Sequence, residues 1–178
     1  MEIPKILLPL QKSLEKAAEN EYAELIKNYL NKRVIPNGIP YFKDSKHVIF
    51  FYFASYPVKS VKVNGDFSVW EKPEEMIPIL PLDTPCNLFH LEMKLPSDAR
   101  IDYKFLIDDA YSEVDPLNPT TVRGGFGLNS EIRMPKFHKT EIEIIVKESD
   151  SIEDKGHIIF PIVDWSISDI MVYLPPDY

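Results

Sequence analysis

The stretch FHLEMKLPSDARIDYKFLI, residues 89–107, decides the fold class. In each half, apolar side chains occupy every second position: Phe89, Leu91, Met93 and Leu95, then Ile101, Tyr103, Phe105 and Ile107. This period of two is typical of a β-strand with one buried face, because successive side chains point to opposite sides of a sheet. Pro96-Ser97-Asp98 between the halves is a turn sequence. The stretch therefore predicts two strands joined by a turn.

More strands are expected upstream. Residues 47–53, HVIFFYF, form an aromatic and β-branched run, and within residues 58–64 Val61 and Val63 alternate with polar residues. Turn sequences follow at Asn64-Gly65-Asp66 and Asp108-Asp109. Short strands, frequent turns and 16 prolines, with no helices between the strands, predict an antiparallel β-sandwich.

One helix is expected, at residues 10–31, ahead of the strands. Its apolar residues recur at spacings of three and four: Leu14, Ala17, Ala18, Tyr22, Leu25, Ile26, Tyr29 and Leu30. Ser13 is interpreted as its cap, and Pro36-Asn37-Gly38 as its end. We expect this amphipathic helix to pack on the sheet, the alternative being a helix that binds a partner.

Three apolar runs follow Pro135, at residues 142–146, 158–163 and 170–174. A polar, charged loop at residues 147–156 separates the first two runs. The last run stops at the end of the sequence, at Pro175-Pro176-Asp177-Tyr178. A domain that finishes on a strand and half a turn is interpreted as interrupted.

Composition narrows the classes of function. The formal net charge of −8 disfavours nucleic acid and anionic membrane as partners, because both require clustered lysines and arginines. Cys86 is the only cysteine, which excludes an internal disulfide and a cysteine-based metal site. The first 20 residues do not resemble a secretory signal, and no apolar run approaches the ~18 residues of a membrane span. We therefore expect a cytoplasmic chain.

The sequence contains no motif that predicts catalysis. The six glycines, at 38, 65, 124, 125, 127 and 156, form neither the G-x-S-x-G of serine hydrolases nor a dinucleotide or phosphate-binding loop. The four histidines lack metal-ligand spacing: His47, His90, His138 and His157. Acidic pairs such as Asp108-Asp109 fall in expected turns. We predict no catalytic residue, no metal and no cofactor.

Several longer motifs occur together. Residues 63–70 (VNGDFSVW), 100–108 (RIDYKFLID) and 115–135 (DPLNPTTVRGGFGLNSEIRMP) resemble segments of the glycogen- and starch-binding β-sandwiches related to early-set immunoglobulin-like domains. With Gly38-Ile39-Pro40 they resemble more closely the version that precedes the α/β-hydrolase domain of enterochelin-esterase-like proteins. Residues 171–178 (MVYLPPDY) resemble the opening of that hydrolase domain.

This resemblance implies an organisation and a role. It implies an N-terminal helical segment at residues 1–37, an immunoglobulin-like sandwich at 38–137 and the first strands of a truncated α/β-hydrolase sheet at 138–178. The chain would then be a non-catalytic accessory domain that helps to shape the substrate entrance or the dimer. Its first partner would be the catalytic domain of the same parent chain, with the nucleophile, acid and histidine all beyond Tyr178.

The resemblance also implies an alternative, a module that binds a neutral carbohydrate. In sugar-binding members a platform for glucose rings is formed by positions that Trp70, Lys104 and Tyr111 occupy here, and Asn129 matches the closing segment. Independently of the resemblance, strand alternation places Lys104 on a solvent-exposed face. The structural alternative is that Trp70 packs under its own turn and anchors it, and that Tyr111 is an aromatic residue at the edge of the sheet.

A third hypothesis is a scaffold or dimerisation domain. Strands at residues 142–146 and 170–174 would normally join a larger sheet. If they are left unpaired, their edges invite pairing with a second copy. This hypothesis predicts either a homo-oligomer or a loosely ordered tail.

Overall fold

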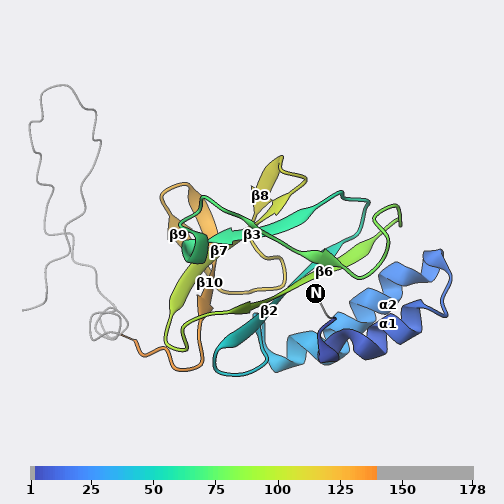
Figure 1. Ribbon diagram of the computed structural model, residues 1–178, viewed down its shortest axis with the longest axis horizontal. Coiled ribbons are helices and arrows are strands. Elements are labelled where there is room, and N and C mark those ends of the chain that lie inside the picture. Colours follow the sequence, from blue (N-terminus) through green and yellow to red (C-terminus); the bar gives the residue numbers. More distant parts are fainter. Residues whose placement is uncertain (1–2, 140–178) are drawn as a thin grey trace, which may run out of the picture. The chain divides into compact units, whose positions relative to one another are not determined.

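Two antiparallel sheets form the framework of the computed structural model, which describes residues 3–139 (Figure 1). The first sheet has the strand order β1 (Tyr41–Phe42), β2 (His47–Ala54), β6 (Asn87–Lys94), β5 (Ile77–Pro78). The second has the order β4 (Glu74–Glu75), β3 (Val61–Gly65), β7 (Arg100–Ile107), β10 (Gly127–Arg133), β9 (Thr121–Gly124), with β8 (Tyr111–Glu113) also paired to β7. The predicted mainly β, two-sheet fold is confirmed.

The two strands predicted within residues 89–107 are β6 and β7, and they lie in different sheets. The turn between them carries the chain from one sheet to the other. Asp108 and Asp109 form the turn from β7 to β8 with φ values of 52° and 54°. Two consecutive positive φ angles suit a tight hairpin, because they match the twist of the paired strands.

The main core lies between the sheets. The alternation along β7 is complete, since Ile101, Tyr103, Phe105 and Ile107 are each no more than 5% exposed. Aromatic rings from the two sheets meet edge to face, with ring centroids 5.1 Å apart for Phe50 and Tyr103. Burying each such side chain stabilises the fold by about 2–3 kcal/mol before entropy costs.

The predicted helix at residues 10–31 is wrong in one respect, because the structure has two helices: α1 (Leu8–Leu14) and α2 (Tyr22–Tyr29). Ala18 between them is extended, with φ −80° and ψ 153°, and its N–H donates to the carboxylate of Glu21. This break reverses the chain, so both helices can place apolar side chains on the same sheet. Short 3-10 turns at Lys5–Leu7, Glu19–Glu21 and Ile35–Asn37 and a π-helical turn at Leu30–Val34 complete the segment.

Two smaller predictions about this segment have different outcomes. Ser13 does not cap a helix start, because its hydroxyl donates to the Pro9 carbonyl within α1. The predicted end is confirmed: the last helical turn finishes at Asn37, and Gly38 follows with a φ of 93°. Glycine adopts this positive φ without the strain that a side chain would add.

The helices cover the outer face of the first sheet, as predicted (Figure 1). A second core lies between them and the sheet; its buried members are Leu7, Leu10, Leu14, Ile26, Leu30, Val34, Ile49, Phe51, Cys86 and Leu88. Strand β2 is therefore buried on both faces, with Phe50 in the main core and Phe51 beneath the helices. Two-sided burial explains why residues 47–53 are apolar without alternation.

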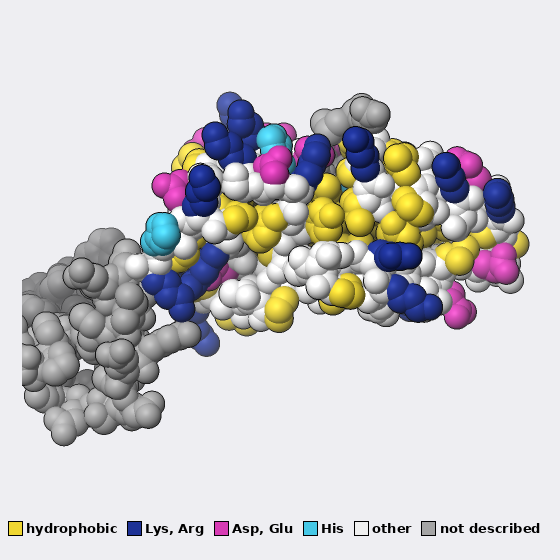
Figure 2. All heavy atoms as spheres, turned by 90° about the horizontal axis from the view of Figure 1, so that it is seen from below, with side chains coloured by type: hydrophobic (Ala, Val, Ile, Leu, Met, Phe, Trp, Pro, Cys, Tyr) yellow, Lys and Arg dark blue, Asp and Glu magenta, His cyan; other side chains and the backbone are white. Residues whose placement is uncertain are grey.

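Some apolar side chains remain exposed on the surface of the molecule. Figure 2 shows hydrophobic side chains gathered in a band along one face of the molecule, bordered by lysines and arginines. Leu8 and Ile35 of the helical segment are 41% and 39% exposed. No helix within residues 3–139 is long and apolar enough to cross a membrane.

The chain divides into two units, Met1–His138 and Lys139–Tyr178. The expected strands at residues 142–146, 158–163 and 170–174, and with them the expected start of a hydrolase sheet, lie outside the described residues. The proposed division at residues 1–37, 38–137 and 138–178 therefore stays a prediction.

Candidate functional site

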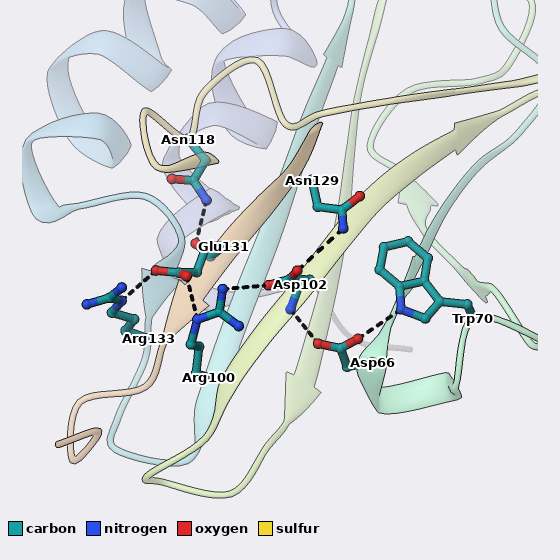
Figure 3. Close-up of polar contacts among 8 residues, drawn as sticks. All are labelled: Asp66, Trp70, Arg100, Asp102, Asn118, Asn129, Glu131 and Arg133. Atoms are coloured by element: carbon teal, nitrogen blue, oxygen red, sulfur yellow. Dashed lines mark hydrogen bonds and ion pairs between the residues drawn. The ribbon is translucent and has the colours of Figure 1, made fainter. Parts of the chain in front are cut away.

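The first motif, VNGDFSVW, builds a turn that is fastened to the neighbouring strand. Asp66 begins a 3-10 turn at Asp66–Ser68, and Val69 and Trp70 follow with φ values of 52° and 62°. The carboxylate of Asp66 accepts one hydrogen bond from Trp70 Nε1 (2.8 Å) and another from the backbone N–H of Asp102 (2.8 Å) (Figure 3). The Asp66 side chain thus ties the turn to β7.

Gly65, immediately before this turn, lies against β7. A Cβ at this position would be 2.4 Å from the backbone oxygen of Asp102 and 3.0 Å from Tyr103 Cβ. No side chain fits at such distances, and the obstructing atoms cannot move without moving the strand. The glycine of the motif is therefore required by the close approach of two backbones.

A polar cluster covers the outer face of the second sheet beside this turn (Figure 3). Asn129 Nδ2 donates to Asp102 Oδ2 (3.4 Å), and Arg100 Nη2 lies 3.3 Å from Asp102 Oδ1. Glu131, only 4% exposed, forms ion pairs with the Nε groups of both Arg100 and Arg133. We call Asp66, Trp70, Arg100, Asp102, Asn129, Glu131 and Arg133 the outer-face cluster.

The charged groups of this cluster are engaged with their neighbours, three carboxylates against two guanidinium groups. The carboxylates of Asp102 and Glu131 face the guanidinium groups of Arg100 and Arg133, and the carboxylate of Asp66 accepts two hydrogen bonds. The arrangement holds β7, β10 and the turn together. It leaves no carboxylate placed as a general base and no concentrated charge for an ionic ligand.

Three of the four predicted site residues lie on this outer face. Trp70 is 37% exposed, but its indole N–H is already occupied by Asp66. Lys104 alternates outward with Asp102 along β7, and its Nζ is 3.5 Å from the Phe126 carbonyl oxygen. Asn129 is directed at Asp102.

The fourth residue, Tyr111, does not join them. In β8 it pairs with Ile107, so its side chain leaves the sheet on the inner face, the face opposite to Lys104. The pairing also places it three residues farther along β7, about 10 Å away. Its hydroxyl shares a hydrogen bond with the hydroxyl of Tyr56. The predicted platform therefore lacks its second aromatic ring in this structure.

Sequence reasoning missed a buried network behind the cluster. The carboxylate of Asp115 accepts a hydrogen bond from the Tyr103 hydroxyl (2.6 Å), and the Asp115 N–H donates to Ser130 Oγ (2.7 Å). Asn118 Nδ2 donates to the Tyr103 hydroxyl (3.1 Å) and to the Glu131 carbonyl (2.9 Å). Burial raises the pKa of Asp115 to about 6, and burial also raises the pKa of Tyr103 well above its usual value.

This framework network unites the motifs. Its four members are Tyr103, Asp115, Asn118 and Ser130, which come from RIDYKFLID, DPLNP and GLNS. All four are between 0% and 5% exposed. The signal that could have found them is Tyr103, because alternation along residues 101–107 predicts that its hydroxyl is buried and needs a hydrogen-bond partner.

Within residues 3–139, no hydrogen bond joins a serine to a histidine. Ser68 Oγ donates to Asn64 Oδ1 (2.8 Å), and the Nδ1 atom of His47 contacts the carboxylate of Asp44. In this same range, no three His, Cys, Asp or Glu side chains gather as metal ligands.

No protein-family model and no curated protein matches the chain. Among solved structures, it is similar to enterochelin esterase from Shigella flexneri (16% identity, TM-score 0.41, covering 54% of this chain and 32% of the esterase). It is also similar to ferric enterobactin esterase from Salmonella typhimurium (20% identity, TM-score 0.44, covering 55% and 34%). A third is a Salmonella typhimurium protein provisionally named an alpha amylase (16% identity, TM-score 0.40, covering 55% and 15%). The chain spans about a third of the length of the two esterases.

Proposed function

We propose that this chain is the non-catalytic accessory part of a larger esterase-like α/β-hydrolase. In the parent protein the sandwich packs beside the catalytic domain and helps to shape its substrate entrance or dimer contact. The nucleophile, acid and histidine belong to that catalytic domain. The resemblance of the motifs to the sandwich of enterochelin-esterase-like proteins motivates this proposal.

One observation carries the proposal furthest. The polar residues of three separate motifs meet in the buried framework network, where a ligand has no access: Tyr103, Asp115, Asn118 and Ser130 are bonded to one another and to the backbone. These motif residues thus hold strands and loops of the sandwich together. This favours a structural module over a catalytic one, because the residues that define the family resemblance are used to build the fold.

The outer-face cluster supports the same interpretation. Its ionic groups are paired, and the Trp70 indole N–H is bonded to Asp66. The carbohydrate alternative is not favoured, because Tyr111 lies on the other face of the sheet from Lys104. Homo-oligomer formation through residues 142–146 and 170–174 concerns residues outside the described range and stays a prediction.

An ester-hydrolysis assay tests the proposal. The purified chain is mixed with a chromogenic acetate ester, and the same concentration of chain denatured in urea serves as the control for simple side-chain reactivity. We expect the folded chain to release product no faster than this control. Saturable turnover that a serine-to-alanine substitution abolishes would contradict the proposal. Independently, we expect the reading frame of the parent to continue into a G-x-S-x-G sequence.

A further inference from the structure

His90 is a polar side chain buried where nothing accepts its hydrogen bonds. It lies in the middle of β6, is 1% exposed, and neither ring nitrogen has a partner. Buried polar groups are hydrogen-bonded in the great majority of cases, so an imidazole without a partner requires an explanation.

The imidazole faces the helices. Leu88, two residues earlier on β6, belongs to the core beneath α1 and α2, and His90 shares its face of the strand. The residues paired with His90 on the adjacent strands are Phe51 in β2 and Ile77 in β5, both apolar. From α1, the buried side chains are Leu10 and Leu14. The surroundings of His90 are therefore almost entirely hydrocarbon.

Few titratable groups lie on this face of the packed elements. Glu92, two residues after His90 on β6, shares the face, and its carboxylate is ion-paired with Lys43 (2.6 Å). Cys86 shares the helix-facing side, and burial raises the pKa of its thiol. In α2, Lys27 Nζ lies 5.6 Å from the centre of the Phe53 ring, and the Tyr29 hydroxyl donates to the Ile6 carbonyl. The chain's amino terminus adds a positive charge. Glu92 carries the one negative charge among these groups, and Lys43 pairs with it.

We propose that the helical segment at residues 5–37 is an acid-sensitive cover on the first sheet, and that protonation of His90 shifts this cover toward an open form. Opening separates the helices from the sheet and lets water reach the imidazole. The sandwich itself remains folded, because its main core lies between the two sheets, on the other side of the first sheet from the helices. The face uncovered is apolar and includes Ile49, Phe51 and Leu88.

The direction of the effect follows from burial. Loss of hydration, the largest cause, lowers the pKa of His90 to about 4 from 6.5. Between these two values a water-exposed His90 takes up a proton and a covered His90 does not. Lowering the pH from 8 to 5 therefore raises the equilibrium ratio of open to closed cover by about 30-fold.

Cys86 is a reporter for this opening, because it is the only cysteine of the chain, is 3% exposed and lies beneath the cover. Its labelling by 4,4′-dithiodipyridine, a reagent that reacts with thiols at acidic pH, is measured from pH 8 to pH 5. Each rate is divided by the rate of the urea-unfolded chain at the same pH. We expect this ratio to rise by about 30-fold, as the linkage relation requires.

Two variants separate His90 from other causes. His90→Leu removes the titrating group, and we expect the ratio to become nearly independent of pH. His138→Gln alters an exposed histidine outside the cover and should keep the full acid response. An acid response that persists in His90→Leu would overturn the proposal.

Two further measurements use the unmodified chain. The first remains informative if His90→Leu fails to fold, and the second distinguishes local opening of the cover from global unfolding. In the unmodified chain, NMR should show no titration of the His90 imidazole between pH 8 and pH 5.5, and a midpoint near 6.5 would overturn the proposal. Amide exchange in β3 and β7, corrected for its intrinsic pH dependence, should stay slow while Cys86 becomes reactive. Exchange of β7 in step with Cys86 would show global unfolding and would also overturn it.

Discussion

The Tyr103 hydroxyl illustrates how single polar atoms fix this fold. It donates to the carboxylate of Asp115 and accepts from Asn118, both well inside the protein. Removing it in Tyr103→Phe takes one hydrogen bond from each of two buried groups, the Asp115 carboxylate and the Asn118 amide, which keep only their bonds to the backbone. We expect a loss of about 1–3 kcal/mol in the free energy of unfolding, measured by urea denaturation.

Tyr111→Phe is the matched control, because Tyr111 is 44% exposed and bonds only another exposed tyrosine hydroxyl, that of Tyr56. Its free energy of unfolding should change by no more than about 0.5 kcal/mol. Equal effects of the two substitutions would show that the framework network does not stabilise the sandwich.

Trp70 allows the structural and carbohydrate-binding interpretations to be separated. Trp70→Phe keeps an aromatic ring but loses the hydrogen bond from Nε1 to Asp66. We expect the variant to be about 1 kcal/mol less stable, and both proteins to migrate unretarded through a gel containing glycogen. Retardation of the unmodified chain that Trp70→Ala abolishes would restore the carbohydrate hypothesis.

Sequence alone located only part of the site. Alternation correctly placed Lys104 on the outer face, because the period of β7 is unbroken. It could not place Tyr111, since the face that this residue occupies depends on the register of β8 against β7. It also missed the bond between Asp115 and Ser130, because partners 15 residues apart leave no local pattern.

Among the elements, the β3 turn depends most on one residue. Gly65→Ala would place a Cβ 2.4 Å from the Asp102 backbone oxygen, so β3 and β7 must separate. We expect a loss of at least about 2 kcal/mol in urea unfolding. Gly125→Ala is the control, since nothing lies within 4 Å of the added carbon. A Gly65→Ala protein as stable as Gly125→Ala would contradict the close packing of these strands.

The sequence predicted the strands that bury one face. It did not predict features that depend on packing between elements. The strand period revealed β6 and β7. The break at Ala18 could not be predicted, because the helical spacing continues across it and only the common sheet beneath α1 and α2 requires the reversal. The apolar run at residues 47–53 predicted a strand. It did not predict that helices cover the second face of this strand.

At the scale of the whole molecule, two buried groups give opposite pH dependence. The pKa of His90 is lowered to about 4, so its contribution to stability is present above pH 6.5 and is lost as the pH falls toward 4. The pKa of Asp115 is raised to about 6, so its contribution is present below pH 3.8 and is lost as the pH rises through 6. Each is worth roughly 3 kcal/mol, and the two nearly cancel between pH 4 and 6.

Removing either group should reveal the pH dependence of stability that the other group causes. As the pH rises from 4 to 6.5, the free energy of unfolding of His90→Leu should fall by roughly 3 kcal/mol relative to that of the unmodified chain. The reason is that the stabilising contribution of His90, which grows over this range, is absent from the variant. Asp115→Asn should show the opposite trend with pH. Urea unfolding at pH 4, 5 and 6.5 measures both differences. Parallel curves for all three proteins would show that neither group is titrated by unfolding.

The central claim is that this chain supplies a framework and no nucleophile. Intact-mass spectrometry after treatment with a fluorophosphonate, which reacts covalently with activated serines, tests it directly. We predict that the folded chain keeps its original mass at concentrations that fully label a serine hydrolase run alongside. A stoichiometric adduct on one serine of the folded chain, absent after unfolding in urea, would contradict the account.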